Sequence, residues 1–138
     1  MREILFRGKP NNAIMENNFI YGLIVKQVDL DGKDALCIQT WERDAEGVSS
    51  RVLEVIPSTI GEFTGLTDKN GTKIFEGDIV KNEYEENKYQ NLKIAYKEKL
   101  YAWVIISNCG RLGMLHNLIG NIEVIGNIYD NLELLKEV

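Results

Sequence analysis

The sequence predicts a mainly β protein, in which an N-terminal β meander is followed by a small C-terminal β-barrel. Apolar residues recur in short runs rich in β-branched and aromatic side chains, and Gly, Asn and Asp bound these runs. Long amphipathic helices are absent from the pattern. A chain of 138 residues can bury roughly two thirds of its unfolded surface, which suits one ordinary domain or two very small ones.

The N-terminal half contains four β-type runs. We expect strands at residues 4–7, 19–28, 34–41 and 48–56. Asp31-Gly32 separates the second and third runs, and a glycine there can take the positive φ of a tight hairpin turn. Residues 43–47 are polar and end in Gly, which predicts a longer turn before the fourth strand.

A proline ends the fourth run, and we place the boundary between the two halves there. The division gives an N-terminal β region at 1–57 and a C-terminal barrel at 58–138, which could also form one integrated unit. Residues 57–63 predict a single helical turn, with Ser58 or Thr59 as its N-cap and a following glutamate that completes a capping box.

The C-terminal half begins with strong turn signals. The Asn-Gly pair within residues 68–71 predicts a hairpin with a return strand at 73–75, and Glu-Gly-Asp at 76–78 predicts a second tight turn before a strand at 79–84. Further strands are expected at residues 90–96, 100–107 and 122–129. Their even spacing favours a small barrel, SH3-like or similar, or a sandwich.

Two C-terminal segments remain ambiguous. Residues 111–119 fit either a helix or a loop, and residues 131–138 fit either a short strand or a turn of helix.

Composition limits the classes of function. The net charge of −5, from 21 acidic and 16 basic side chains, disfavours nucleic-acid binding without excluding it. Residues 1–10 do not resemble a secretory signal, and no run approaches the ~20 apolar residues of a membrane-spanning helix. Cys37 and Cys109 lie in apolar surroundings, as expected for reduced, buried thiols. We therefore expect a cytoplasmic protein.

Three segments carry a resemblance to a known family. They are TIGEFTGLTDKNGTKIFEGDIV at residues 59–80, REILFR at 2–7, and EVIGNIYDN at 123–131 followed by ELL at 133–135. In this order the segments resemble the signature of the YopX family, small proteins of bacteriophages and prophages of low-GC Gram-positive hosts. The resemblance implies a β-rich cytoplasmic protein with an N-terminal β region and a C-terminal small barrel. The family has no established biochemical activity, so the resemblance assigns no functional residue.

Residues that could support catalysis or bind a metal are scarce. His116 is the only histidine and could pair with Cys109, but a buried cysteine and a partly exposed histidine explain both more simply. With two distant cysteines and one histidine, the spacing of a zinc site is missing. A glycine-rich phosphate loop that opens a helix is also missing. We expect no cofactor and no metal.

Three carboxylates flank the first C-terminal hairpin and could converge on a divalent cation or on acid-base chemistry. They are Asp68, Glu76 and Asp78. The simpler interpretation is turn chemistry, in which Asp68 and Asp78 accept hydrogen bonds from their own turns. A carboxylate-based, metal-dependent hydrolase is therefore a distant third hypothesis.

Aromatic and basic residues interleave in the C-terminal half, a pattern that could stack nucleic-acid bases while cations meet phosphates. An ordinary β-sheet has the same pattern. The candidate surface for nucleic acid or a protein partner consists of Tyr84, Tyr89, Lys93, Tyr96, Lys97, Lys99 and Tyr101.

We expect a non-catalytic protein-interaction module, which the resemblance places among phage and prophage accessory proteins. Its partner would be a host or phage protein, and a homo-oligomer is also expected because β proteins often cover strand edges by pairing. The alternative is a nucleic-acid-binding β-barrel in phage replication or gene control. We predict that the protein is not an enzyme.

Overall fold

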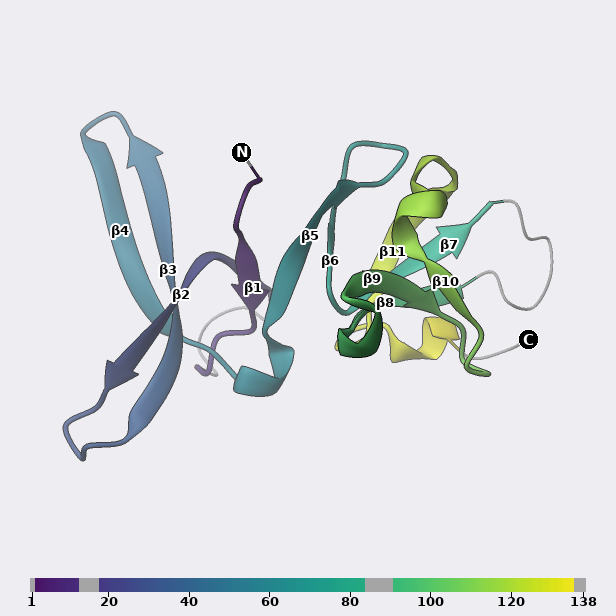
Figure 1. Cartoon of the computed structure of the whole chain (residues 1–138). Helices are drawn as coiled ribbons and strands as arrows, with labels where there is room; N and C mark the ends of the chain where they lie inside the picture. The colour runs from purple at the N-terminus through teal and green to yellow at the C-terminus, as the bar shows by residue number, and fades with distance from the viewer. Residues whose placement is uncertain (1, 13–17, 84–90, 136–138) are drawn as a thin grey trace. The chain divides into compact units, whose positions relative to one another are not determined.

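The computed structural model describes residues 2–12, 18–83 and 91–135, and in this part of the chain the protein is mainly β, as predicted (Figure 1). The chain divides into two compact units, Met1–Glu62 and Phe63–Val138. No described helix is long and apolar enough to cross a membrane.

The N-terminal unit is built on an antiparallel sheet in the order β4-β3-β2-β1-β5, of which β5 contributes only its first two residues to this unit. The strands are β1 (Phe6–Gly8), β2 (Ile20–Val28), β3 (Asp34–Asp44), β4 (Gly47–Glu54) and β5 (Gly61–Thr67), with a 3₁₀ helix, η1 (Pro57–Thr59), between the last two. The predicted second, third and fourth strands are confirmed. The first strand begins two residues later than predicted.

The predicted longer turn at residues 43–47 is wrong. β3 extends to Asp44 and β4 begins at Gly47, so only Ala45 and Glu46 connect them. The ladder continues to the pair Asp44 and Gly47, and Asp44 Oδ1 accepts a hydrogen bond from Glu46 N at 2.8 Å. The short turn and the regular pairing make a long hairpin that Figure 1 shows in blue.

The predicted capping box at residues 57–63 is also wrong. η1 has Ile56 at its N-cap, without a side-chain cap, because Pro57 already occupies the first helical position and needs no N–H partner. Thr59 serves another purpose: its Oγ1 donates to Ile56 O at 2.6 Å and accepts from Lys9 N at 2.8 Å. Glu62 belongs to β5.

Two cations are buried in the N-terminal unit. Arg7 and Lys9 are 5% and 4% exposed, and both lie over the Phe19 ring, at 4.1 and 4.3 Å from its centroid. Cation-π contacts of this kind are stronger when they are desolvated. These side chains therefore belong to the interior of this unit.

The C-terminal unit contains a five-stranded antiparallel sheet in the order β10-β9-β8-β7-β11, and β6 pairs with the remainder of β5. The strands are β6 (Lys73–Phe75), β7 (Asp78–Asn82), β8 (Asn91–Lys97), β9 (Ala102–Ile106), β10 (Leu112–Met114) and β11 (Ile122–Asn127). The predicted strands are confirmed with small changes of boundary. In the described residues β10 and β11 end the sheet without a closing ladder, so the sheet is not a closed barrel and agrees only loosely with the predicted small barrel.

Short 3₁₀ helices complete the C-terminal unit. They are η2 (Glu98–Leu100), η3 (Leu115–Asn117), η4 (Ile119–Asn121) and η5 (Leu132–Leu135). The ambiguous segment 111–119 is thus a strand followed by 3₁₀ turns, and part of segment 131–138 is the helical turn η5. The core cluster consists of Ile74, Val80, Leu92, Ile94, Ile105, Leu115 and Ile122. Trp103 packs against this cluster while partly buried.

Candidate interaction surface

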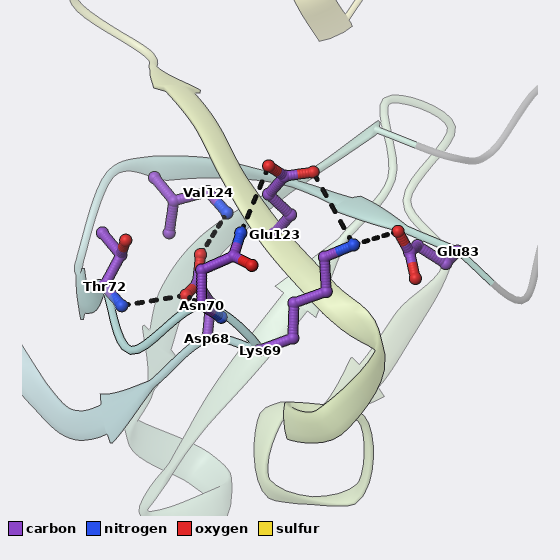
Figure 2. A network of polar contacts seen from close by, with 7 residues as sticks. All are labelled: Asp68, Lys69, Asn70, Thr72, Glu83, Glu123 and Val124. Carbon is purple, nitrogen blue, oxygen red and sulfur yellow. Dashed lines mark hydrogen bonds and ion pairs between the residues drawn. The ribbon is translucent and has the colours of Figure 1, made fainter.

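Asp68 is occupied by backbone donors (Figure 2). Its side chain is 6% exposed, and its Oδ1 accepts hydrogen bonds from Asn70 N and Thr72 N, both at 2.9 Å. Its Oδ2 accepts from Val124 N of β11 at 2.9 Å. A buried carboxylate satisfied in this way ties the β5–β6 turn to a strand 56 residues away in sequence.

Asp78 has a comparable structural role. It is buried at the start of β7, and its Oδ2 accepts from Phe75 N at 2.8 Å across a turn in which Gly77 has φ +89°. Glu76 lies in the same turn. In the described ranges, no group of three or more His, Cys, Asp and Glu residues could hold a metal ion. The geometry thus favours turn chemistry for both aspartates.

Lys69 links the same turn to two acidic side chains (Figure 2). Its Nζ bonds Glu83 and lies 4.0 Å from Glu123 Oε2, while Asn70 Nδ2 donates to Glu123 Oε1 at 3.3 Å. The hydrogen bond with Glu83, helped by the charges around it, raises the pKa of the Lys69 ammonium above its ordinary value. This partly exposed network reinforces the turn.

The aromatic and basic candidate residues do not form one mixed face where they are described. Tyr84 and Tyr89 lie outside the described residues. Lys93 and Lys97 occupy one face of β8 and Tyr96 the other, because successive side chains of a strand alternate. Residues that alternate along the sequence therefore lie on opposite faces of β8, and the two lysines are separated from the Tyr96 ring.

The other members of that set lie around η2. Lys99 lies within η2 and is exposed. Tyr101 directly follows η2, is 87% exposed and has a left-handed φ of +49°. The Tyr96 ring packs edge-on against Trp103, with ring centroids 5.2 Å apart. Tyr101 is therefore the most accessible aromatic ring of the set in the described part of the chain.

A larger exposed apolar surface lies on the N-terminal unit. The register pairs Gln39 of β3 with both Leu23 of β2 and Val52 of β4, and it pairs Trp41 with Ser50. Directly paired residues point to the same side of a sheet, so one side carries the apolar members. We call this set the apolar face: Leu23, Trp41, Val48 and Val52, which are 41, 49, 61 and 37% exposed.

The two cysteines differ in environment. Cys37 is buried, as predicted, with its Sγ 3.8 Å from Gln27 Oε1, and burial followed by the nearby Glu54 charge raises the pKa of its thiol. The prediction that Cys109 is buried is wrong. Cys109 is exposed in the turn after β9, with its Sγ 3.2 Å from Ser107 Oγ, because β9 ends before this polar turn.

A family model described as YopX protein matches residues 6–136, nearly the whole chain. The chain belongs to the YopX family. The resemblance seen in the sequence is thereby confirmed. The comparison with curated proteins finds no match.

Among solved structures, this YopX-family chain is similar to protein EF1440 from Enterococcus faecalis, known from its crystal structure. The two share 22% sequence identity and a TM-score of 0.58, over 99% of this chain and 100% of EF1440. At this level of identity the similarity shows the fold alone.

Most of the segment that resembles the YopX signature, residues 59–80, serves the architecture of the C-terminal unit, while residues 59–62 belong to the N-terminal unit. It contains Asp68 and Asp78, whose carboxylates hold turns, and Gly71 and Gly77, whose φ angles are +82° and +89°. The apolar face lies outside this segment. Sequence reasoning missed it because the strand register, which was unknown, decides that these four residues share one side. The signal available was an isolated Trp41 in a polar stretch.

Proposed function

We propose that this YopX-family protein is a non-catalytic phage accessory module that binds another protein through the apolar face of its N-terminal unit. The observation that carries the proposal is the exposure of Trp41 and Val48 beside Leu23 and Val52 on one side of a regular sheet. Exposed apolar side chains gathered on one side of a sheet, here with Gln39 and Ser50 between them, are a feature of interaction sites. Tryptophan is also enriched among the residues that dominate binding energy.

Two further observations support a binding role over chemistry or nucleic-acid contact. Asp68 and Asp78 are buried and accept hydrogen bonds from backbone N–H groups, which leaves them poorly placed for acid-base work. Lys93 and Lys97 project from the opposite side of β8 to Tyr96, so these residues do not combine stacking with phosphate contact on one face.

The proposal is tested by affinity capture of the tagged full chain from a lysate of the phage-bearing host, with nuclease added. The captured protein is then purified and its affinity titrated against wild type and Trp41→Ser. We expect Trp41→Ser to weaken binding about tenfold or more. Tyr101→Ser, which removes an even more exposed ring from the other unit, is the matched control and should bind like wild type.

Equal affinity for wild type and Trp41→Ser would overturn the proposal. Loss of all captured material on nuclease treatment would favour nucleic-acid binding instead, and the next variants would then reverse the charges of Lys93 and Lys97.

A further inference from the structure

The outer edge of β4 presents backbone groups in a definite pattern. Just after β4, Val55 N donates to Leu36 O of β3 at 3.0 Å, so Val55 faces β3. Glu54 O accepts from Asn11 N at 2.9 Å, so Glu54 faces the outer edge. In an antiparallel ladder, successive residues turn their N–H and C=O groups alternately toward the partner strand and away from it. The outward-facing groups of β4 therefore belong to Val48, Ser50 and Val52.

No described strand pairs with this edge over residues 47–53. Beyond it, Asn11 bonds Glu54, and Pro10 forms an isolated bridge with Val55. Within it, the register with β3 has no bulge, the residues include no proline, and Arg51 is the only charged side chain. Natural sheets protect their edges with bulges, prolines and charges, so an edge of this kind is a template for another strand.

We propose that this edge pairs with the same edge of a second copy of the chain, antiparallel and centred on Ser50. The inference rests on the proposed protein-binding role and adds a second copy of the chain as the partner of the β4 edge. Pairing of one edge with itself about a two-fold axis is necessarily antiparallel. With the axis at Ser50, residues 47–53 of the two copies overlap in full, and Val48 lies opposite Val52 of the second copy.

The backbone and the side chains both fit this register. Val48, Ser50 and Val52 form pairs that exchange two hydrogen bonds each, so the joined ladder gains about six. Val48 and Val52 both point to the apolar face, which becomes continuous across the two copies. Each Trp41 then lies in one row with the two Ser50 residues, since Trp41 pairs with Ser50 in its own chain.

Neighbouring registers fit less well. An axis at Arg51 would set the two guanidinium groups opposite each other, and like charges directly opposite are destabilising. An axis at Ser49 would shorten the overlap to residues 47–51. In the register centred on Ser50, Arg51 lies opposite Ser49 of the second copy, while it keeps its own ion pair with Glu42, at 3.2 Å.

The register is tested by mixing two full-length variants, Ser49→Cys and Arg51→Cys, each carrying Cys109→Ser to remove the exposed thiol. These two positions form a non-hydrogen-bonded pair across the axis, with Cα atoms about 4.5 Å apart, within disulfide range. In either variant alone, the equivalent positions of two copies are roughly 8 Å apart, beyond that range.

We expect a disulfide-linked dimer on a non-reducing gel after oxidation of the mixture, and at least about fivefold less from either variant alone. A mixture that stays monomeric, or single variants that cross-link as well as the mixture, would overturn the proposal. Both substitutions lie on exposed positions of β4, and Trp41 is unchanged in each.

Sedimentation equilibrium supplies a second measurement. Ser50→Pro removes an outward N–H and leaves the hydrogen bonds to β3 in place, which is the position where an edge strand tolerates proline. We expect it to raise the dimer dissociation constant at least about tenfold, because two hydrogen bonds are lost. Ser50→Ala, the matched control, should dimerise like wild type, and equal dimerisation by all three proteins would contradict the proposal.

The two proposals fail separately. If the protein is monomeric and still captures another protein in a way that depends on Trp41, only the proposed self-pairing of the β4 edge is overturned. If the protein forms the dimer centred on Ser50 but Trp41→Ser does not change its affinity for the captured protein, only the binding role proposed for the apolar face is overturned.

Discussion

The β2–β3 turn of the N-terminal unit and the β5–β6 turn of the C-terminal unit are built in the same way. In the first, Asp29 N donates to Lys33 O at 2.8 Å, and Asp29 Oδ1 accepts from Asp31 N and Lys33 N at 2.9 and 2.8 Å. Gly32 takes the left-handed position, with φ +78°. This is a short hairpin loop in which an aspartate fastens its own turn.

The second turn repeats these bonds around Asp68, with Asn70, Gly71 and Thr72 in the corresponding places and distances of 2.8 to 3.0 Å. The difference lies outside the turn. Asp29 remains exposed, whereas Asp68 is buried and its second oxygen holds Val124 of β11. The same local chemistry is therefore a surface feature in one unit and a tertiary tie in the other.

The contrast extends to the two units. Among the described residues, three buried apolar side chains belong to the N-terminal unit and twelve to the C-terminal unit. Burial of apolar surface is the main stabilising term in folding, so the C-terminal unit has the stronger basis for stability of its own. In the described part of the chain, the N-terminal unit keeps apolar side chains exposed and has β4 at the edge of its sheet, which is why we propose that this unit binds the partner.

Breaking the tertiary tie should have the largest effect. Asp68→Ala leaves buried N–H groups without an acceptor and should destabilise the protein by about 3–5 kcal/mol. Asp29→Ala, the matched change in the exposed turn, should cost about 1 kcal/mol or less because water can replace the lost bonds. Urea unfolding of both variants measures the difference, and equal losses would show that burial of Asp68 adds nothing.

The glycines of the two turns test the backbone contribution that both turns share. Gly32→Ala and Gly71→Ala both force a Cβ into the left-handed region, with no atom of a non-adjacent residue within 4 Å of the new carbon, so each should cost about 1 kcal/mol. Gly120→Ala also enters open space but has no positive φ, and it should change stability by less than about 0.5 kcal/mol. Unequal costs for the first two variants would contradict a purely local penalty.

Tyr101 places a bulky residue where the two turns use glycine. Tyr101→Gly relieves the left-handed backbone at φ +49° but gains freedom in the unfolded chain, so we expect a net stabilisation of about 0.5 kcal/mol. Tyr101→Ala retains the Cβ and should give no such gain. Thermal unfolding compares the three proteins, and a loss of stability in the glycine variant would point to contacts made by the ring.

Removal of single charged pairs should give the smallest effects, and the pair at the C-terminal turn should give the larger of the two. The pKa of Lys69 is raised in the folded state, so its contribution to stability is complete below the ordinary pKa of about 10.4 and is lost as pH rises through the higher folded value. The stability difference between wild type and Lys69→Met should therefore shrink at alkaline pH. Urea midpoints between roughly pH 9 and 12 measure it.

Lys26→Met provides the matched change in the N-terminal unit, since Lys26 Nζ lies 2.9 Å from Asp34 Oδ2 at an exposed site. Exposed pairs contribute little, so we expect a smaller effect than at Lys69. A larger effect would reverse the order of the two units.

Several elements could be predicted from the sequence because their causes are local. Short runs of apolar residues bounded by turn residues identified β2, β3 and β4, and Asp-Gly or Asn-Gly pairs identified the turns that contain Gly32 and Gly71. The errors occurred where a longer-range contact decides. β3 continues through polar residues to Asp44 because its partner strand is present, and Thr59 bonds Lys9 where a cap was expected.

The candidate surface shows the same limit. The sequence identified residues such as Tyr96 and Lys93 from their spacing, but pleating sends neighbouring positions of β8 to opposite sides. The apolar face escaped notice because it is assembled from three strands, and only their register brings Leu23, Trp41 and Val52 to one side.

By itself, the sequence determined the mainly β class, most of the strands, the glycine turns and membership of the YopX family, since these depend on short-range patterns of side chains. Tertiary structure decided that Asp68 reaches Val124, that Lys93 and Tyr96 face apart, and that β4 lies at the edge of the described sheet. Strand pairing joins residues far apart in the chain, and a shift by one residue would exchange the two faces of a strand. Register is therefore the property that local patterns could not supply.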